Sequence, residues 1–244
     1  MRPATARREG EQHVTASKRT TDAHGTGRYA EVNGVNLYFE THGAGRPMIL
    51  LHGGLGSGEM FGPVLPALAE RHQVIAVDLQ GHGRTADIDR PIDVRLMADD
   101  IAALIDHLGL DRPDLVGYSL GGGVALHTAA TYPAKVGRLV VASAHVRFDA
   151  IDPKLRIRQA QVGAAAAEVM TDTPMSRRSQ RVAPRPEDVP RLLDGGRRDG
   201  GWMGEGRPKG GHALAILPGL THYNAAISPL FAAVTLAFLD DRPN

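Results

Sequence analysis

The chain contains no cysteine, and this absence excludes three kinds of chemistry at once. Disulfide bonds, thiolate metal sites and cysteine nucleophiles all require a thiol, so none of them contributes to the fold or the function. A composition without cysteine also fits a protein that works in a reducing compartment.

The chain also lacks an excess of charge of either sign. Its 28 Lys and Arg residues face 27 Asp and Glu residues, which leaves a net charge of +1. Proteins that gather nucleic acid or anionic membrane through their electric field concentrate positive charge. We therefore expect neither as a partner and expect a small-molecule substrate instead. The sequence leaves the oligomeric state open.

Long apolar runs are missing as well. No stretch approaches the length of a membrane helix, and residues 1–27 contain almost no large apolar side chain. Arg7-Arg8 could open an export signal, but Glu9-Gly10-Glu11 follows where an apolar run would be needed. We expect a disordered tail over residues 1–27 and a cytoplasmic protein.

What is present is enough apolar sequence for one soluble domain. The chain has 244 residues, of which 42% are apolar and 23% charged. Strand patterns and helix patterns alternate along it, which predicts an α/β fold with an open, mostly parallel sheet flanked by helices. The expected strands are a hairpin over 29–40 that turns at Asn33-Gly34, then 47–51, 73–78, 114–117, 137–144 and 212–217, and the expected helices are 63–71, 94–108, 122–132 and 229–240.

The predicted core is interrupted once. Residues 28–148 form its first part, residues 149–193 form a small helical insert resembling a cap, and residues 194–244 return to the core through a loop, a last strand and a C-terminal helix. Residues 164–170 are the best helical patch of the insert, and several prolines break the stretch after it.

The most informative motif is Gly117 to Gly121, which fits the pattern G-x-S-x-G with Ser119 at its centre. The pattern can arise by chance in a chain with 29 glycines. Its position between a predicted strand and a predicted helix is the context that gives it meaning, because a serine on so sharp a turn exposes its hydroxyl. We therefore predict that Ser119 is a nucleophile.

A second motif, His52-Gly53-Gly54, also follows a predicted strand. Ligands bind at the carboxyl ends of strands in open α/β sheets. If Ser119 attacks a carbonyl, the backbone N–H groups of Gly54 and Leu120 are placed to stabilise the negative oxygen, at about 3 kcal/mol per donor. The alternative is that Gly54 is an ordinary loop glycine.

The general base of such a site is expected to be a histidine late in the chain. Among the 11 histidines, His222 follows the last predicted strand and precedes the last helix, so its ring could lie at the same edge of the sheet as Ser119. The alternative is a histidine in a surface loop.

Together these motifs make residues 29–241 resemble the α/β-hydrolase superfamily. The segments that match are His52 to Gly54, Asp78 to Thr85, Gly117 to Gly122 and Leu217 to His222. The resemblance implies an α/β-hydrolase fold and hydrolysis of a carboxylic ester or related acyl compound through a serine acyl-enzyme. It implies no metal and no cofactor. The turn after Asp78 is then mainly structural, His82 included.

The chain departs from this family where the acid of the catalytic triad belongs. Members of this kind carry another apolar strand before the last one, ending in an aspartate-bearing turn, and no such strand is visible over 183–211. The turn Ser143-Ala144-His145 contains no carboxylate that could replace this acid. Four aspartates are available, but none of them follows a strand in the expected way: Asp149, Asp152, Asp194 and Asp199. The acid is unassigned, and we expect a weak or inactive hydrolase.

Two other functions remain open. A non-catalytic binding protein on the same scaffold is one, since fold does not fix function. A nucleotide-binding oxidoreductase of the Rossmann type, using NAD or NADP, is the other, because Gly54 to Gly58 is rich in glycine and Asp78 ends the next strand. Against it, Glu59 stands where the third glycine should be, and Tyr132 and Lys135 are one residue too close for a dehydrogenase pair.

Overall fold

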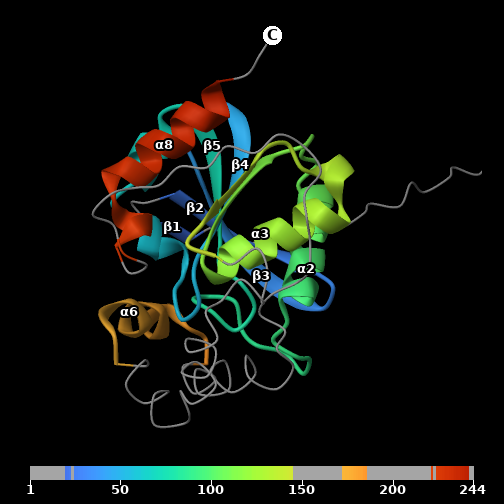
Figure 1. The fold of residues 1–244 in the computed structure, drawn as a ribbon. Coiled ribbons are helices and arrows are strands. Elements are labelled where there is room, and N and C mark those ends of the chain that lie inside the picture. Colours follow the sequence, from blue (N-terminus) through green and yellow to red (C-terminus); the bar gives the residue numbers. More distant parts are fainter. Residues whose placement is uncertain (1–19, 23–24, 145–171, 186–220, 222–223, 242–244) are drawn as a thin grey trace, which may run out of the picture.

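The computed structural model describes residues 20–22, 25–144, 172–185, 221 and 224–241. They contain a sheet of seven strands in the order β1-β2-β3-β5-β4-β6-β7, with helices on both sides (Figure 1). The predicted α/β class with a mostly parallel sheet is confirmed. Within these residues no helix is long and apolar enough to cross a membrane.

The N-terminal strands form the antiparallel side of the sheet. They are β1 (Thr20–Asp22), β2 (Gly25–Val32) and β3 (Val35–His42), and β3 then pairs antiparallel with β5. Asn33 and Gly34 turn the hairpin with φ angles of 48° and 81°, the left-handed conformation that this dipeptide tolerates. Strand pairing therefore begins inside the stretch 1–27 that the sequence predicts as a tail, because Thr20–Asp22 pair with Gly25–Gly27 at the edge of the sheet.

The remaining four strands are parallel. Their spatial order is β5 (His72–Val77), β4 (Arg46–Leu51), β6 (Asp114–Tyr118) and β7 (Leu139–Ala142). In β4 the side chains of Met48, Ile49, Leu50 and Leu51 are all fully buried. A continuous apolar run of this kind forms where helices cover both faces of a parallel sheet. All four strands bring their carboxyl ends to one edge.

Helices cover the two faces unequally. On one face lie α2 (Val94–His107) and α3 (Leu120–Thr131). On the other lie the short α1 (Leu65–Ala69), the 3-10 turns η1 (Gly58–Phe61) and η5 (Ala225–Ile227), and α8 (Pro229–Asp240). The rings of Phe61 and Phe231 stack with their centroids 6.3 Å apart, which joins η1 to α8. A further 3-10 turn, η2 (Pro133–Lys135), follows α3.

Residues 172–185 of the predicted insert are described. They contain α6 (Pro174–Val182), which lies apart from the sheet (Figure 1). Thr173 caps its first turn, where its hydroxyl accepts the N–H of Ser176 at 3.2 Å. Three predicted features lie outside the described residues: the helix at 164–170, the strand at 212–217 and most of the shortened stretch at 183–211. The first three residues of that stretch are described.

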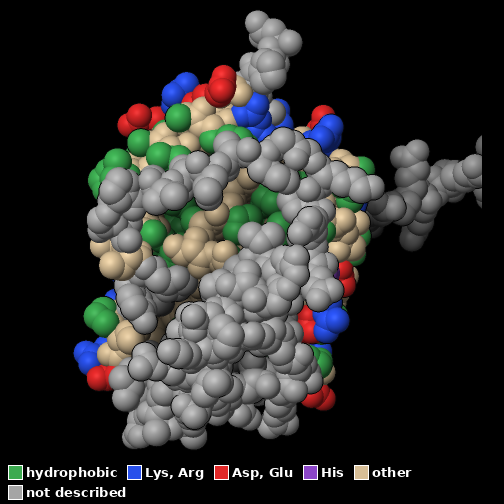
Figure 2. Space-filling model, viewed as in Figure 1, with side chains coloured by type: hydrophobic (Ala, Val, Ile, Leu, Met, Phe, Trp, Pro, Cys, Tyr) green, Lys and Arg blue, Asp and Glu red, His purple; other side chains and the backbone are tan. Residues whose placement is uncertain are grey.

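The surface has apolar side chains along the α8 side of the molecule (Figure 2). Ile227 and Leu230 there are 44% and 47% exposed. Scattered exposed apolar side chains are normal in soluble proteins, so these two carry no functional argument.

Candidate active site

Ser119 occupies the turn between β6 and α3. Its φ and ψ angles are 53° and −115°, a region that residues with a side chain rarely adopt. Such a conformation costs of order 1 to 3 kcal/mol and persists where the surrounding structure enforces it. The serine is partly exposed, while Tyr118 before it and Leu120 after it are buried.

Close backbone contacts enforce this turn. A Cβ atom on Gly117 would lie 2.2 Å from the carbonyl oxygen of Gly121, and one on Gly121 would lie 2.3 Å from the carbonyl oxygen of Leu51. Only glycine fits at either position. The N–H of Ser119 donates to the carbonyl of Ala142 at 2.9 Å, which fastens the turn to β7.

The loop after β4 lies directly beside Ser119. A Cβ atom on Gly53 would be 3.3 Å from the Cβ of Ser119. The N–H of Gly121 donates to the carbonyl of His52 at 2.9 Å, so the start of α3 and the end of β4 are bonded together. The structure thus brings together Ser119 and the loop that carries Gly54.

Hydrogen bonds set the direction of the Gly53–Gly54 peptide group. The carbonyl oxygen of Gly53 accepts from the N–H of Gly56 at 3.1 Å and from Nδ1 of His52 at 2.7 Å. In a trans peptide the C=O and the N–H point in opposite directions, so the N–H of Gly54 points away from these two donors. Leu120 is the first residue of α3, where an N–H has no acceptor within the helix. Among the described residues, no backbone hydrogen bond within a turn is found for the N–H of Gly54 or Leu120, the two predicted oxyanion donors.

His52 is held as a neutral ring. Its Nδ1 must carry the proton, because its partner is a carbonyl oxygen, and its Nε2 accepts the N–H of Leu79 at 3.0 Å. Burial lowers the pKa of His52 from its usual 6.5 to about 4. The sequence shows this histidine only as a neighbour of two glycines. Its bond to Leu79 spans 27 residues, so no local signal predicts it.

The turn after β5 is structural, as expected. The buried carboxylate of Asp78 accepts the N–H of Gly58 at 2.6 Å and the N–H of Arg84 at 2.9 Å. Burial, the largest influence, raises the pKa of Asp78. His82 donates from Nδ1 to the carbonyl of Gln80 at 2.8 Å, and burial lowers its pKa to about 3. Asp78 is 1% exposed, so its carboxylate is not accessible to a ribose, which removes the main support for a dinucleotide site.

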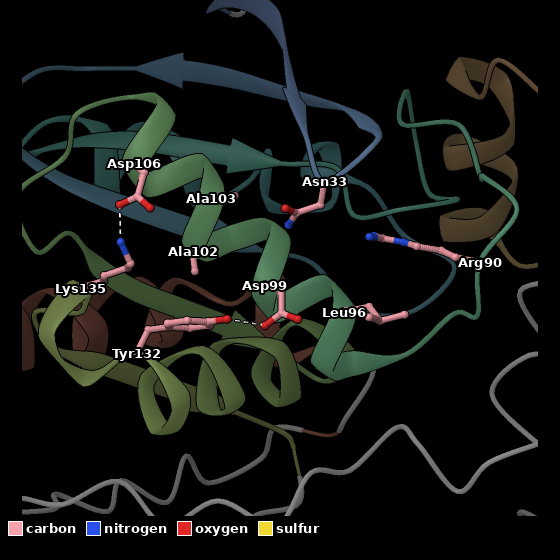
Figure 3. A pocket seen from close by; sticks show the side chains of 9 residues that line it. All are labelled: Asn33, Arg90, Leu96, Asp99, Ala102, Ala103, Asp106, Tyr132 and Lys135. Carbon is pink, nitrogen blue, oxygen red and sulfur yellow. Dashed lines mark hydrogen bonds and ion pairs between the residues drawn. The ribbon is translucent and has the colours of Figure 1, made fainter.

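The Tyr132 and Lys135 pair lies in a separate cavity of about 370 Å³ on the α2 side (Figure 3). The hydroxyl of Tyr132 donates to Asp99 at 2.7 Å, and Lys135 pairs with Asp106. No residue of the loop 54–58 lines this cavity. The pair is therefore bound to carboxylates of α2 and away from the glycine-rich loop.

His222, the predicted base, lies outside the described residues, and so do Asp149, Asp152, Asp194 and Asp199. Thr221, directly before His222, is described, and the description resumes at Asn224. Thr221 donates its N–H to Oδ1 of Asn224 at 2.6 Å, and Ala225 and Ala226 are buried in the same apolar cluster as Tyr118. The residues three and four positions after His222 thus belong to the same buried cluster as Tyr118, the residue that precedes Ser119.

The acid also stays unassigned. Three of the most buried carboxylates among the described residues are Asp78, Asp100 and Asp114, and each pairs with an arginine. Within the described parts of the chain, no group of three or more His, Asp or Glu side chains could hold a metal ion.

Comparison with known sequences gives relatives that are longer than the matched region. The chain is 40% identical over 119 residues to a soluble epoxide hydrolase of Corynebacterium sp. (strain C12), a match that covers 48% of this chain and 41% of that enzyme. It is 38% identical over 122 residues to RutD of Azorhizobium caulinodans, an assigned carbamate hydrolase, covering 50% of this chain and 46% of RutD. The chain therefore matches less than half the length of these relatives.

Comparison with solved structures agrees on the fold. An epoxide hydrolase, CorEH without ligand, superposes with a TM-score of 0.54 at 27% identity, covering 72% of this chain and 70% of that one. E-2-(acetamidomethylene)succinate hydrolase superposes with a TM-score of 0.66 at 21% identity, covering 89% of this chain and all of that one. The second likeness shows the fold alone.

A family model described as the alpha/beta hydrolase fold matches residues 46–170, just over half of the 244 residues. The matched stretch contains β4, the turn after β5, the Ser119 turn and β7. The chain therefore belongs to the alpha/beta hydrolase fold family.

Proposed function

We propose that the protein hydrolyses a small or medium uncharged carboxylic ester or related acyl compound, with Ser119 as the nucleophile. The observation that carries the proposal is the conformation of Ser119. Ser119 has a φ of 53° between a strand and a helix, and glycines on either side enforce this angle. The angle costs conformational free energy, and packing alone gives no reason for that cost. A reactive hydroxyl presented at the edge of the sheet gives it a reason.

In the proposed mechanism, His222 takes the proton from Ser119 as its oxygen attacks the acyl carbon. The oxygen that becomes negative accepts hydrogen bonds from the backbone N–H groups of Gly54 and Leu120. The acyl-enzyme then forms as the alcohol leaves with the proton from His222, and water releases the acid in a second round. No metal or cofactor takes part in this scheme.

The names of the relatives support hydrolysis but not one substrate. One is an epoxide hydrolase and another an assigned carbamate hydrolase. Hydrolases of this fold that open epoxides use an aspartate nucleophile, and this chain has Ser119 at the corresponding turn. We therefore favour an acyl substrate over an epoxide.

A second candidate function is binding without catalysis, because no triad acid is identified among the described residues. Loss of the acid in a serine protease lowers turnover about 10⁴-fold, so a weak esterase is expected even if the other groups are in place. Hydrolysis of p-nitrophenyl acetate by the wild type and by Ser119→Ala separates the two functions. Turnover that Ser119→Ala lacks supports the hydrolase, and equal rates in both proteins support the binding protein.

A further inference from the structure

A single buried hydroxyl joins α6 to two loops of the core. Ser179 is 7% exposed, and its Oγ donates to the carbonyl of Gly56 at 2.9 Å. The same Oγ accepts the N–H of Gly83 at 3.0 Å. The two loops follow β4 and β5, so one side chain of the insert ties together neighbouring parts of the edge where Ser119 lies.

Gly56 ends the turn that carries Gly54. Its N–H donates to the carbonyl of Gly53 at 3.1 Å, and Leu55, between them, has a φ of 60°. A buried leucine in this conformation is strained, so the turn needs contacts that hold it. His52 holds the carbonyl at the start of the turn, and Ser179 holds the carbonyl at its end.

We propose that Ser179 is a positioning residue that fixes the turn from Gly53 to Gly56 and thereby the direction of the Gly54 N–H. The inference rests on the proposed function, since it gives Gly54 the role of an oxyanion donor. It also assigns a task to α6: the insert sets the geometry of the site through this bond. A movement of α6 would therefore change the turnover of the enzyme as well as the access of substrate to the site.

The neighbours of Ser179 on α6 make different contacts. Ser176 is also buried, but its Oγ accepts from Nε2 of Gln180 at 3.1 Å, within the same helix. Arg178 approaches Glu59 at 3.5 Å with about half of its side chain exposed, and exposed pairs of this kind contribute little. Ser179 thus supplies the buried, directed contact between α6 and the Gly56 carbonyl, and Ser176 offers a matched control.

The test uses the full chain in four forms: wild type, Ser179→Ala, Ser179→Cys and Ser176→Ala. Amide hydrogen exchange is followed in peptides that cover 53–58 and 81–85, and kcat and KM are measured with p-nitrophenyl acetate. A neutral hydrogen bond of this kind predicts about a tenfold effect. We expect both Ser179 variants to exchange about tenfold faster in these peptides and to lose about tenfold in kcat with KM within twofold, while Ser176→Ala behaves as wild type.

The cysteine variant separates hydrogen bonding from loss of volume, because a thiol is larger than the hydroxyl that it replaces but bonds weakly. Wild-type behaviour of Ser179→Cys would show that the side chain acts by volume, and it would overturn the inference. So would unchanged exchange in Ser179→Ala, equal changes in Ser176→Ala, or a rise in KM with no fall in kcat. If the wild type shows no turnover, the proposed function fails, and the exchange rates alone still decide whether Ser179 holds the turn.

Discussion

Leu79 donates its backbone N–H to Nε2 of His52 over 3.0 Å, and this bond joins the loop after β5 to the loop after β4. It requires a neutral His52, because a protonated Nε2 would present a second donor to the N–H of Leu79. The turn that carries Gly54 therefore depends on the protonation state of His52, which has no role in the proposed mechanism.

Acid should destabilise the fold through the buried His52 and His82. Their pKa values are lowered from 6.5 to about 4 for His52 and about 3 for His82, mainly by burial. The unfolded chain then binds protons that the folded chain does not, so the free energy of unfolding should fall as pH drops from about 6.5 toward 4. Urea unfolding at several pH values measures this slope. His82→Asn should flatten it, and an unchanged slope would contradict the assignment.

Ser119→Gly should stabilise the protein, because glycine adopts a φ of 53° without steric cost. The expected gain in the free energy of unfolding is about 1 kcal/mol, and Ser119→Ala should stay close to wild type. Both variants should lose ester turnover. Urea unfolding of the three proteins checks the order, and a glycine variant less stable than the alanine variant would argue against strain at this residue.

Gly121→Ala should be severely destabilising, since its Cβ would lie 2.3 Å from the carbonyl oxygen of Leu51. Separating α3 from β4 to relieve that contact should cost about 3 kcal/mol or more. Gly109→Ala gives a comparison without a clash: Gly109, unlike Gly121, has a positive φ, 61°, and no atom lies within 4 Å of its Cβ position. The control should lose about 1 kcal/mol. Thermal unfolding of both variants measures the difference, and equal losses would mean that the close contact is relieved at little cost.

His222→Ala should abolish whatever ester turnover the protein has. In the wild type, kcat should rise with pH through the range in which a histidine loses its proton, because the neutral ring is the base. Rate profiles from pH 5 to 9 for both proteins check this. A profile that the substitution leaves unchanged would place the base at another residue.

The sequence predicts much of the fold because its signals are local. The last helix is expected over 229–240 and found as Pro229–Asp240, since Ser228 caps it and Pro229 opens it. The hairpin at Asn33-Gly34 has a similarly local cause. The helix expected over 63–71 is shorter, Leu65–Ala69, because the chain around Val64 turns through 3-10 bonds before the helix begins.

The supports of the candidate site could not be predicted, because their partners are far apart in the chain. The bond between Ser179 and Gly56 spans 123 residues and that between His52 and Leu79 spans 27. Nothing in the sequence of α6, a short helix rich in arginine, indicates that Ser179 makes such a contact. The motif around Ser119 does predict the turn, because the glycines that the turn requires are close to Ser119 in the sequence.

Labelling with a fluorophosphonate probe tests the central claim most directly, because the probe reacts with a serine whose hydroxyl is activated. Intact mass and peptide mass spectrometry would locate the adduct. We expect one adduct, on Ser119, which forms more slowly in His222→Ala and is absent in Ser119→Ala. A wild-type protein that stays unlabelled, or that is labelled at another serine, would contradict it.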